Sequence, residues 1–170
     1  MQYATIQNLA KKIGYDELSQ RASNANAALI NPRLMQLIVE SGDYSAFAQN
    51  DITNAQNGIA AINEALEEAS REIDVYLASA VNLPLTTISN QIIDICCRIA
   101  RYRVARYESG SEDESRVYRD YINELERLKL FATGKLAISG LIGYQPDNTQ
   151  NTNATAAYRS YAVIAPTQSY

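Results

Sequence analysis

Two apolar stripes dominate the chain from Ile59 to Tyr107, which reads IAAINEALEEASREIDVYLASAVNLPLTTISNQIIDICCRIARYRVARY. The apolar residues recur at steps of three and four, first as Ile59, Ile62, Leu66, Ala69, Ile73, Tyr76 and Ala80, then as Ile88, Ile92, Ile95, Ile99 and Tyr102. This spacing places each set on one side of an α-helix. We therefore predict a long helix from about Gly58 to Ala80, a break at Leu83–Pro84, and a second helix that faces the first, with Leu66 and Ile95 in the core between them.

Shorter helices are predicted on either side of this pair. Thr5 suits the cap of a first helix that Gly14 ends, and a short segment over 16–22 follows. Asn31–Pro32 is a typical start for another helix, which ends near Gly42. After Ser109–Gly110–Ser111 we expect a third long helix with the stripe Tyr118, Tyr121, Leu125 and Leu128, closed by Gly134. Short connections favour an antiparallel bundle, so the predicted fold class is all-α.

Length and composition indicate one ordinary globular domain with a small net charge. The chain has 170 residues, 46% of them hydrophobic and 20% charged, with a net charge of −4. A negative protein has no overall attraction to nucleic acid or to an anionic membrane surface. The start lacks a secretory signal, and no apolar run approaches the roughly 20 residues that span a bilayer. We expect a protein that is made and assembled in the cytoplasm and has no membrane partner.

The residue types of common catalytic and metal sites are missing or badly placed. The chain contains no histidine and no glycine-rich phosphate loop, which excludes histidine-based nucleophile systems. The carboxylates of Glu67, Glu68, Glu72 and Asp74 lie opposite the apolar stripe and read as a solvated helix face. Adjacent Cys96 and Cys97 read as small buried hydrophobes, because their side chains diverge on a helix. We predict no enzyme activity, no cofactor and no metal site.

An arginine-rich run is the strongest local signal for binding. Arg98, Arg101, Arg103 and Arg106 alternate with Tyr102 and Tyr107. Three interpretations remain open. The arginines pair within the chain, with Asp94 opposite Arg98 and with the acidic residues 112–114; they contact another subunit, where arginine and tyrosine are favoured; or they bind phosphates and stack bases.

The C-terminal end changes character. Residues 136–143 are apolar and fit either a strand or a packed extended segment, and they close a helical body over 1–143. Residues 144–170 form the predicted arm: a polar spacer that cannot bury itself, then an apolar end able to dock on a partner. The candidate docking residues are Tyr158, Tyr161, Val163 and Ile164.

Several short motifs in order resemble the Mu-type phage neck family. They are MQYATIQNL at the start, GYDEL at 14–18, ALEEASREIDVYL at 65–77, LPL at 83–85, Asp94–Ile95, IARY at 99–102 and Gly134–Lys135. The likeness covers the first helix and 59 to about 141. Residues 23–58 look like an enlargement, and the tail from Tyr144 looks longer than is usual in that family.

The resemblance implies a head-tail connector, or adaptor, at the virion neck. It implies a homo-oligomeric ring of about twelve copies that binds the portal protein on one side and a downstream neck or tail protein on the other. Genomic DNA would pass through such a ring and could contact it in passing. The alternative that the residues leave open is a stand-alone helical regulator that binds nucleic acid through the arginine and tyrosine face.

Overall fold

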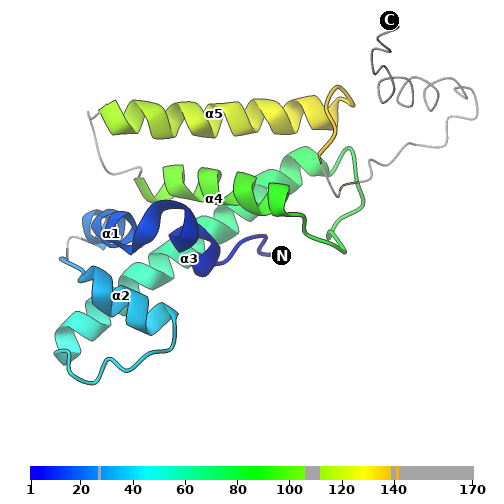
Figure 1. The fold of residues 1–170 in the computed structure, drawn as a ribbon. Helices are drawn as coiled ribbons and strands as arrows, with labels where there is room; N and C mark the ends of the chain where they lie inside the picture. Colours follow the sequence, from blue (N-terminus) through cyan, green and yellow to red (C-terminus); the bar gives the residue numbers. More distant parts are fainter. Residues whose placement is uncertain (27, 106–111, 139–140, 142–170) are drawn as a thin grey trace, which may run out of the picture.

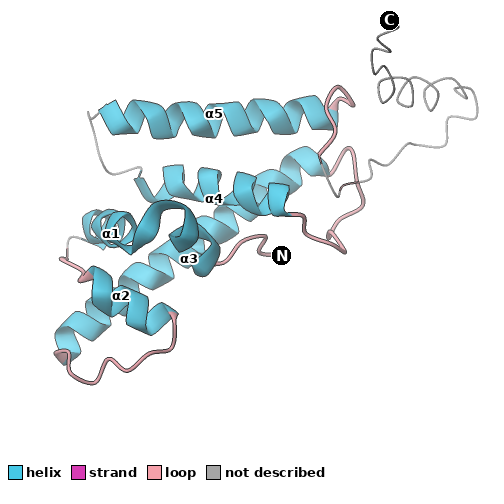
Figure 2. Ribbon diagram, in the orientation of Figure 1, coloured by secondary structure: helices cyan, strands magenta, loops and turns pink. Residues whose placement is uncertain are grey.

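A computed structural model of the protein describes residues 1–26, 28–105, 112–138 and 141 (Figure 1). The described part is helical, without strands (Figure 2). In chain order the helices are α1 Ile6–Asn26, α2 Pro32–Val39, α3 Gln49–Leu77, α4 Asn90–Ala105 and α5 Glu112–Ala132. The predicted all-α class is confirmed.

The helix α1 is the predicted pair of short helices joined across a kink. At its start the Thr5 hydroxyl accepts from the Asn8 N–H at 3.3 Å, and the Thr5 N–H donates to Asn8 Oδ1 at 2.9 Å. The kink lies at Gly14, where φ is 82° and ψ is 160°. A Cβ at Gly14 would meet nothing within 4 Å. Glycine is therefore required there by the backbone conformation and not by lack of space.

The predicted cap of α2 is present. The Asn31 side chain accepts from the N–H groups of Arg33 and Leu34, and Pro32 occupies the first turn. The first N–H groups of a helix have no partner within the helix. The Asn31 side chain accepts from two of them, and Pro32 has no N–H that needs a partner. The helix ends at Val39, somewhat before the predicted Gly42.

The predicted start of α3 near Gly58 is wrong, because α3 begins at Gln49. Ile52 and Ala55 extend its buried stripe toward the N-terminus. Gly58 lies inside the helix, where a Cβ would contact the Ile30 side chain and lie 3.1 Å from Ala22 Cβ. This glycine thus permits close approach of α1 and of the residues before α2, and it does not mark a helix boundary.

The core is organised around α3, which contacts each of the other four helices. In Figure 1, α2 lies against its N-terminal half, and α4 and α5 run in opposite directions beside its C-terminal half. Leu66 and Ile95 are both fully buried, as predicted. The largest fully buried side chains are Leu9, Leu18, Leu34, Met35, Ile62, Leu66, Ile73, Leu77, Ile92, Ile95, Ile99 and Leu128.

The two cysteines belong to this core. Cys96 and Cys97 are free thiols with exposed fractions of 0% and 2%. Burial raises the pKa of the Cys97 thiol to about 12. Both side chains therefore pack as small neutral groups at neutral pH, as predicted.

The buried face of α5 differs from the predicted stripe. Tyr118 is 48% exposed, whereas Val117, Glu124 and Phe131 are buried beside the predicted Leu128. The buried face of α5 therefore includes a glutamate, Glu124, whose partner is described below.

The end of α5 is a Schellman motif. The N–H of Lys135 donates to the Leu130 carbonyl at 2.8 Å, and the N–H of Gly134 donates to the Phe131 carbonyl at 2.9 Å. Gly134 has a φ of 70°, which is the left-handed conformation that this motif requires. The predicted closure at Gly134 is confirmed.

Beyond α5, residues 136–138 and 141 form no strand, and Ile138 is buried against the core. The rest of 136–143 and the predicted arm over 144–170, with Tyr158, Tyr161, Val163 and Ile164, lie outside the described residues. No helix in the described ranges is long and apolar enough to cross a bilayer.

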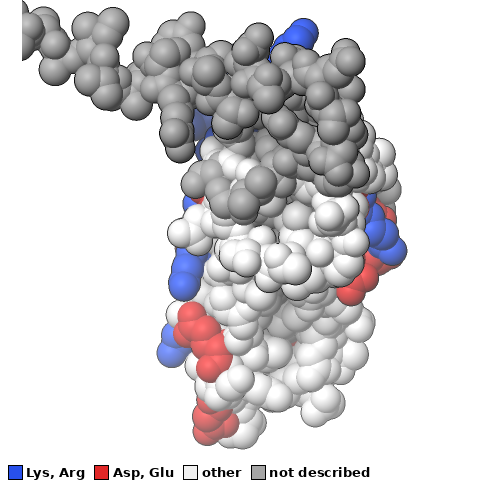
Figure 3. Space-filling model, turned by 90° about the vertical axis from the view of Figure 1, so that its right-hand side faces the viewer, with Lys and Arg blue, Asp and Glu red and all other residues white. Residues whose placement is uncertain are grey.

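One end of the body is poor in charge. Figure 3 shows the right-hand end of Figure 1, where uncharged residues cover most of the described surface and charged side chains lie along its margins. The chain from 75 to 93, which includes the connection between α3 and α4, contains no charged residue. Leu83 in this connection is 36% exposed.

Candidate functional site

The arginines of α4 reach three different helices. Among the described residues, Arg101 binds α1, Arg103 binds α3 and Arg98 binds α5. Arg101 and Arg103 are two residues apart and point to opposite sides of the helix, whereas Arg98 and Arg101 are three apart and lie near the same face but reach different neighbours. The single arginine face suggested by the sequence is therefore divided among three contacts.

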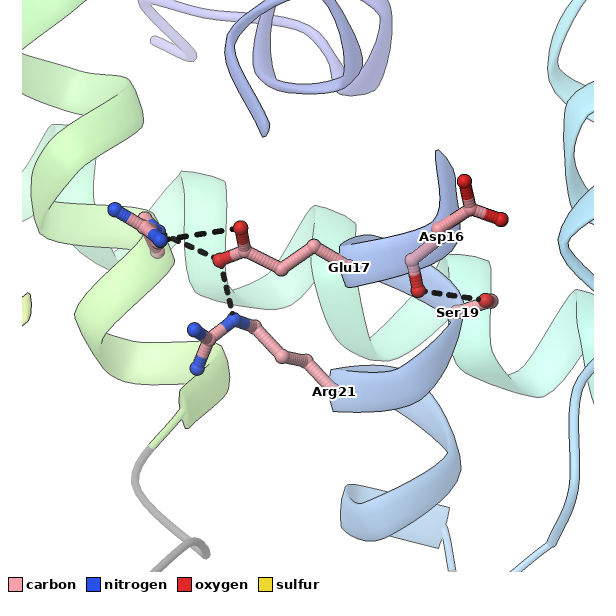
Figure 4. Close-up of polar contacts among 5 residues, drawn as sticks. Asp16, Glu17, Ser19 and Arg21 are labelled. Atoms are coloured by element: carbon pink, nitrogen blue, oxygen red, sulfur yellow. Dashed lines mark hydrogen bonds and ion pairs between the residues drawn. The ribbon is translucent and has the colours of Figure 1, made fainter. Parts of the chain in front are cut away.

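The contact with α1 is centred on Glu17. Arg101 donates from Nε and Nη2 to the two Glu17 carboxylate oxygens at 2.7 and 3.1 Å. Arg21 Nε also donates to Glu17 Oε1 at 2.7 Å (Figure 4). The Arg21 side chain is only 5% exposed. A fork-shaped pair of this kind fixes orientation as well as distance, so it holds the part of α1 after the Gly14 kink against α4.

The contact with α3 joins one cation to two carboxylates. Arg103 lies 2.7 Å from Glu68 and 2.8 Å from Glu72. The Tyr121 hydroxyl of α5 also donates to Glu72, at 2.9 Å. The predicted solvated face is confirmed for Glu67, which is exposed, but Glu68 and Glu72 pair with Arg103 of α4 and Asp74 accepts from the Tyr3 hydroxyl. A local view of α3 could not reveal this, since the cation is supplied by another helix.

Burial and charge shift the ionisation of this cluster in a consistent direction. Burial lowers the pKa of Arg103, but its bonds to Glu72 and Glu68 outweigh that effect and raise the pKa overall. Burial, with the bond to Glu72, raises the pKa of Tyr121 to about 12. The cluster is thus one cation, two anions and a neutral phenol at neutral pH.

The contact with α5 places a buried carboxylate under an exposed arginine. Arg98 Nη1 donates to Glu124 Oε1, and the side chains are 55% and 3% exposed. Arg127 Nη1 lies 3.6 Å from the other Glu124 oxygen, which has no hydrogen-bond partner among the described residues. A carboxylate this deeply buried is tolerable only with a cation beside it.

The predicted partners of the arginines are not the ones observed. Asp94, expected opposite Arg98, instead pairs with Lys12 of α1 at 2.6 Å. Arg106 and the side chains of 112–114 lie outside the described residues. Pairing within the chain therefore holds for Arg98, Arg101 and Arg103, through carboxylates that the sequence pattern did not indicate.

Three tyrosines pack between α4 and α5. Tyr102 stacks on Tyr121 with ring centroids 4.2 Å apart and an interplanar angle of 14°. Tyr118 packs at a tilt, 5.7 Å from Tyr102. The three rings pack against one another as an aromatic cluster. Tyr118 keeps about half of its surface exposed.

The arrangement has the character of a structural lock that joins four helices. Its cations are paired and its phenols take part in hydrogen bonding or stacking. Within the described ranges, no group of three or more histidine, cysteine, aspartate or glutamate side chains is placed to hold a metal ion. What the site does chemically is to fix α4 relative to α1, α3 and α5.

The chain belongs to the Bacteriophage Mu, Gp36 family, whose sequence model matches residues 3–158. It is also similar to the Mu-like prophage FluMu protein gp36 of Haemophilus influenzae, with 35% identity over 79 residues. That match covers 46% of this chain and 53% of the relative, so the chain spans about half the length of the curated relative. The predicted relation to Mu-type phage proteins is confirmed at the level of the family.

Proposed function

We propose that the chain is a structural subunit of the phage head-tail connector, which forms a ring between portal and tail and completes the DNA-filled head. Two observations support this role: the chain resembles the Mu-type neck proteins, and it belongs to the Gp36 family. The partners are further copies in a ring of about twelve, the portal, and a downstream neck or tail protein. The place is the virion neck, after assembly in the host cytoplasm, and no catalytic step is assigned.

The observation that carries the proposal is the internal pairing of the α4 arginines. A regulator that binds nucleic acid needs cations free to contact phosphates. Arg101 and Arg103 instead bind three carboxylates of α1 and α3, and Arg98 binds a buried one. Together with the net charge of −4, this pairing weighs against the regulator and favours a role in protein assembly.

The uncharged end of the body supports the same reading. The centres of protein interfaces are depleted in charged residues relative to other surface. The charge-free chain over 75–93, with exposed Leu83, provides such a surface at one end of the helices (Figure 3). A connector subunit needs a surface of this kind to stack on a component above or below it.

The test is a phage in which the gene for this chain carries a stop codon. We expect DNA-filled heads and separate tails, with few joined particles, and recovery of joined particles when the protein is supplied in trans. Electron microscopy of the purified chain with and without portal should show rings only on the portal. Normal particles with altered phage transcription would instead support the nucleic-acid regulator and overturn the proposal.

A further inference from the structure

A pocket of mixed polar and apolar lining lies between the N-terminal segment and the outer side of α3. It has a volume of about 310 Å³ and is lined by Met1, Gln2, Glu67 and Arg71. This space is large enough for one big side chain. It lies away from the arginine contacts of α4 and has no part in the lock described above.

The N-terminal wall of the pocket is held in place by buried contacts. The N–H of Tyr3 donates to Ser70 Oγ at 2.9 Å, and its hydroxyl donates to Asp74. Tyr3 and Ser70 are 3% and 1% exposed. The Gln2 side chain donates to the Ala4 carbonyl at 2.8 Å. The pocket therefore exists before any partner arrives, which lowers the cost of binding.

The rim of the pocket combines two charged side chains that form no ion pair among the described residues with exposed apolar surface. Glu67 and Arg71 are exposed and form no ion pair within the part of the chain that the structure describes. Met1 is 66% exposed, and Val75, one turn after Arg71, is 76% exposed. Glu67, Arg71 and Val75 thus follow one another at single-turn spacing along one line of α3.

The C-terminal arm has the complementary order of residues. The segment Tyr158–Ile164 reads YRSYAVI. When such a segment binds as an extended strand, residues 159, 161 and 163 point to one side. Their spacing of about 6.6 Å closely matches the rise of about 6 Å over four residues of an α-helix. Arginine, tyrosine and valine on the arm then meet glutamate, arginine and valine on α3 in register.

We propose that residues 158–164 of a neighbouring copy dock along α3, with Arg159 on Glu67, Tyr161 in the pocket against the Arg71 stem, and Val163 on Val75. The inference rests on the proposed function, because it requires a neighbour in a ring. The chain from Leu141 to Arg159 spans up to about 60 Å when extended. That reach exceeds the length of α3, about 44 Å for its 29 residues, so the arm is long enough to extend beyond its own helical body.

The first test joins the two sides covalently in portal-bound rings of the full-length chain. The double variant Val75→Cys, Val163→Cys is oxidised and analysed on a non-reducing gel. Docking between neighbours gives a ladder of linked chains. The native Cys96 and Cys97 are buried and give little background. The matched control, Ala60→Cys with Val163→Cys, puts an exposed cysteine on the same helix about 22 Å away and should give no ladder.

The remaining outcomes separate this inference from the proposed function. A link within one chain would show that the arm covers its own body, and rings without any link would show that the arm docks elsewhere. Either result overturns the docking and leaves the connector proposal intact. Failure of the unmodified chain to form rings on the portal would overturn the connector proposal and the docking with it.

A charge exchange gives a second, independent measurement. Glu67→Arg or Arg159→Glu alone should lower the yield of rings about tenfold, because each ring repeats the opposed like charges at every interface. The double exchange should restore the yield to within about threefold of the unmodified chain. Glu64→Arg, an equal charge reversal one turn earlier on α3, should leave the yield unchanged. Equal losses for Glu64→Arg and Glu67→Arg would overturn the assigned contact.

Discussion

Replacing Leu66 with alanine tests the core at the point where α3 meets α4. Leu66 is fully buried, and its backbone is held in the α3–α4 contact, because the Cys96 thiol packs 3.7 Å from the Leu66 carbonyl oxygen. Because Leu66 is enclosed on all sides, the neighbouring side chains cannot move far enough to fill the cavity that an alanine would leave. Leu→Ala changes in such sites cost about 2 to 5 kcal/mol through lost burial and the cavity left behind, so we expect about 3 to 4 kcal/mol for Leu66→Ala.

Urea unfolding followed by circular dichroism measures this cost. With a slope of about 2 kcal/mol per molar urea, the unfolding midpoint should fall by about 1.5 to 2 M. Leu130→Ala is the matched control, since Leu130 is 44% exposed on α5 and should change stability by less than about 0.5 kcal/mol. Equal midpoints for the two variants would refute the placement of Leu66 in the core.

Four further predictions concern the lock, the kink and the arm. Arg103→Met leaves Glu68 and Glu72 without their cation and should destabilise the fold by about 2 kcal/mol, less than a fully buried pair would cost because the three side chains are partly exposed; calorimetry at neutral pH checks it. The pKa of Tyr121, raised from its usual value near 10 to about 12, means that its share of stability is present below pH 10 and lost as the pH rises through 12, so Tyr121→Phe should show a shallower fall in alkaline melting scans. Gly14→Ala should cost about 1 kcal/mol or more, because φ is 82° there and a side chain rarely adopts that backbone conformation. The space beside Gly14 is open, so the cost comes from the backbone alone, and a melting temperature at or above that of the unmodified chain would contradict this. Deletion of residues 144–170 should keep the melting temperature within about 3 °C yet abolish tail joining, and a loss of several degrees would show instead that the arm completes the fold.

Periodicity was sufficient to predict the elements that bury a continuous stripe, but it failed at the N-terminal end of α3. The residue before α3 is Ala48, which makes no side-chain cap bond, so the sequence carries no start signal there. Gly58 resembles a boundary in sequence. It is a contact point in the structure, because its missing Cβ makes room for Ile30 and Ala22.

The partners of the arginines escaped prediction for a different reason. Charge pairing read from sequence finds neighbours three or four residues apart on one helix. Arg101 binds Glu17 across 84 positions, and Arg103 binds Glu68 across 35. Only the packing of the helices decides which of many carboxylates comes within reach. The useful sequence signal was the count of arginines on one short helix, which indicated a contact surface without naming its partners.

The ion pairs of α4 contribute more to a unique arrangement than to total stability. A partly buried ion pair returns little net free energy, since desolvation offsets much of the attraction, but a buried member such as Glu124 is costly to leave without its cation. Rotation or sliding of α4 would leave Glu124 and Glu72 without their cations, and it would break the pair of Arg101 with Glu17 at the same time. The three contacts therefore penalise every other position of α4. The ring proposed above would need this property in each subunit, because small differences in shape between copies accumulate around a ring and prevent its closure.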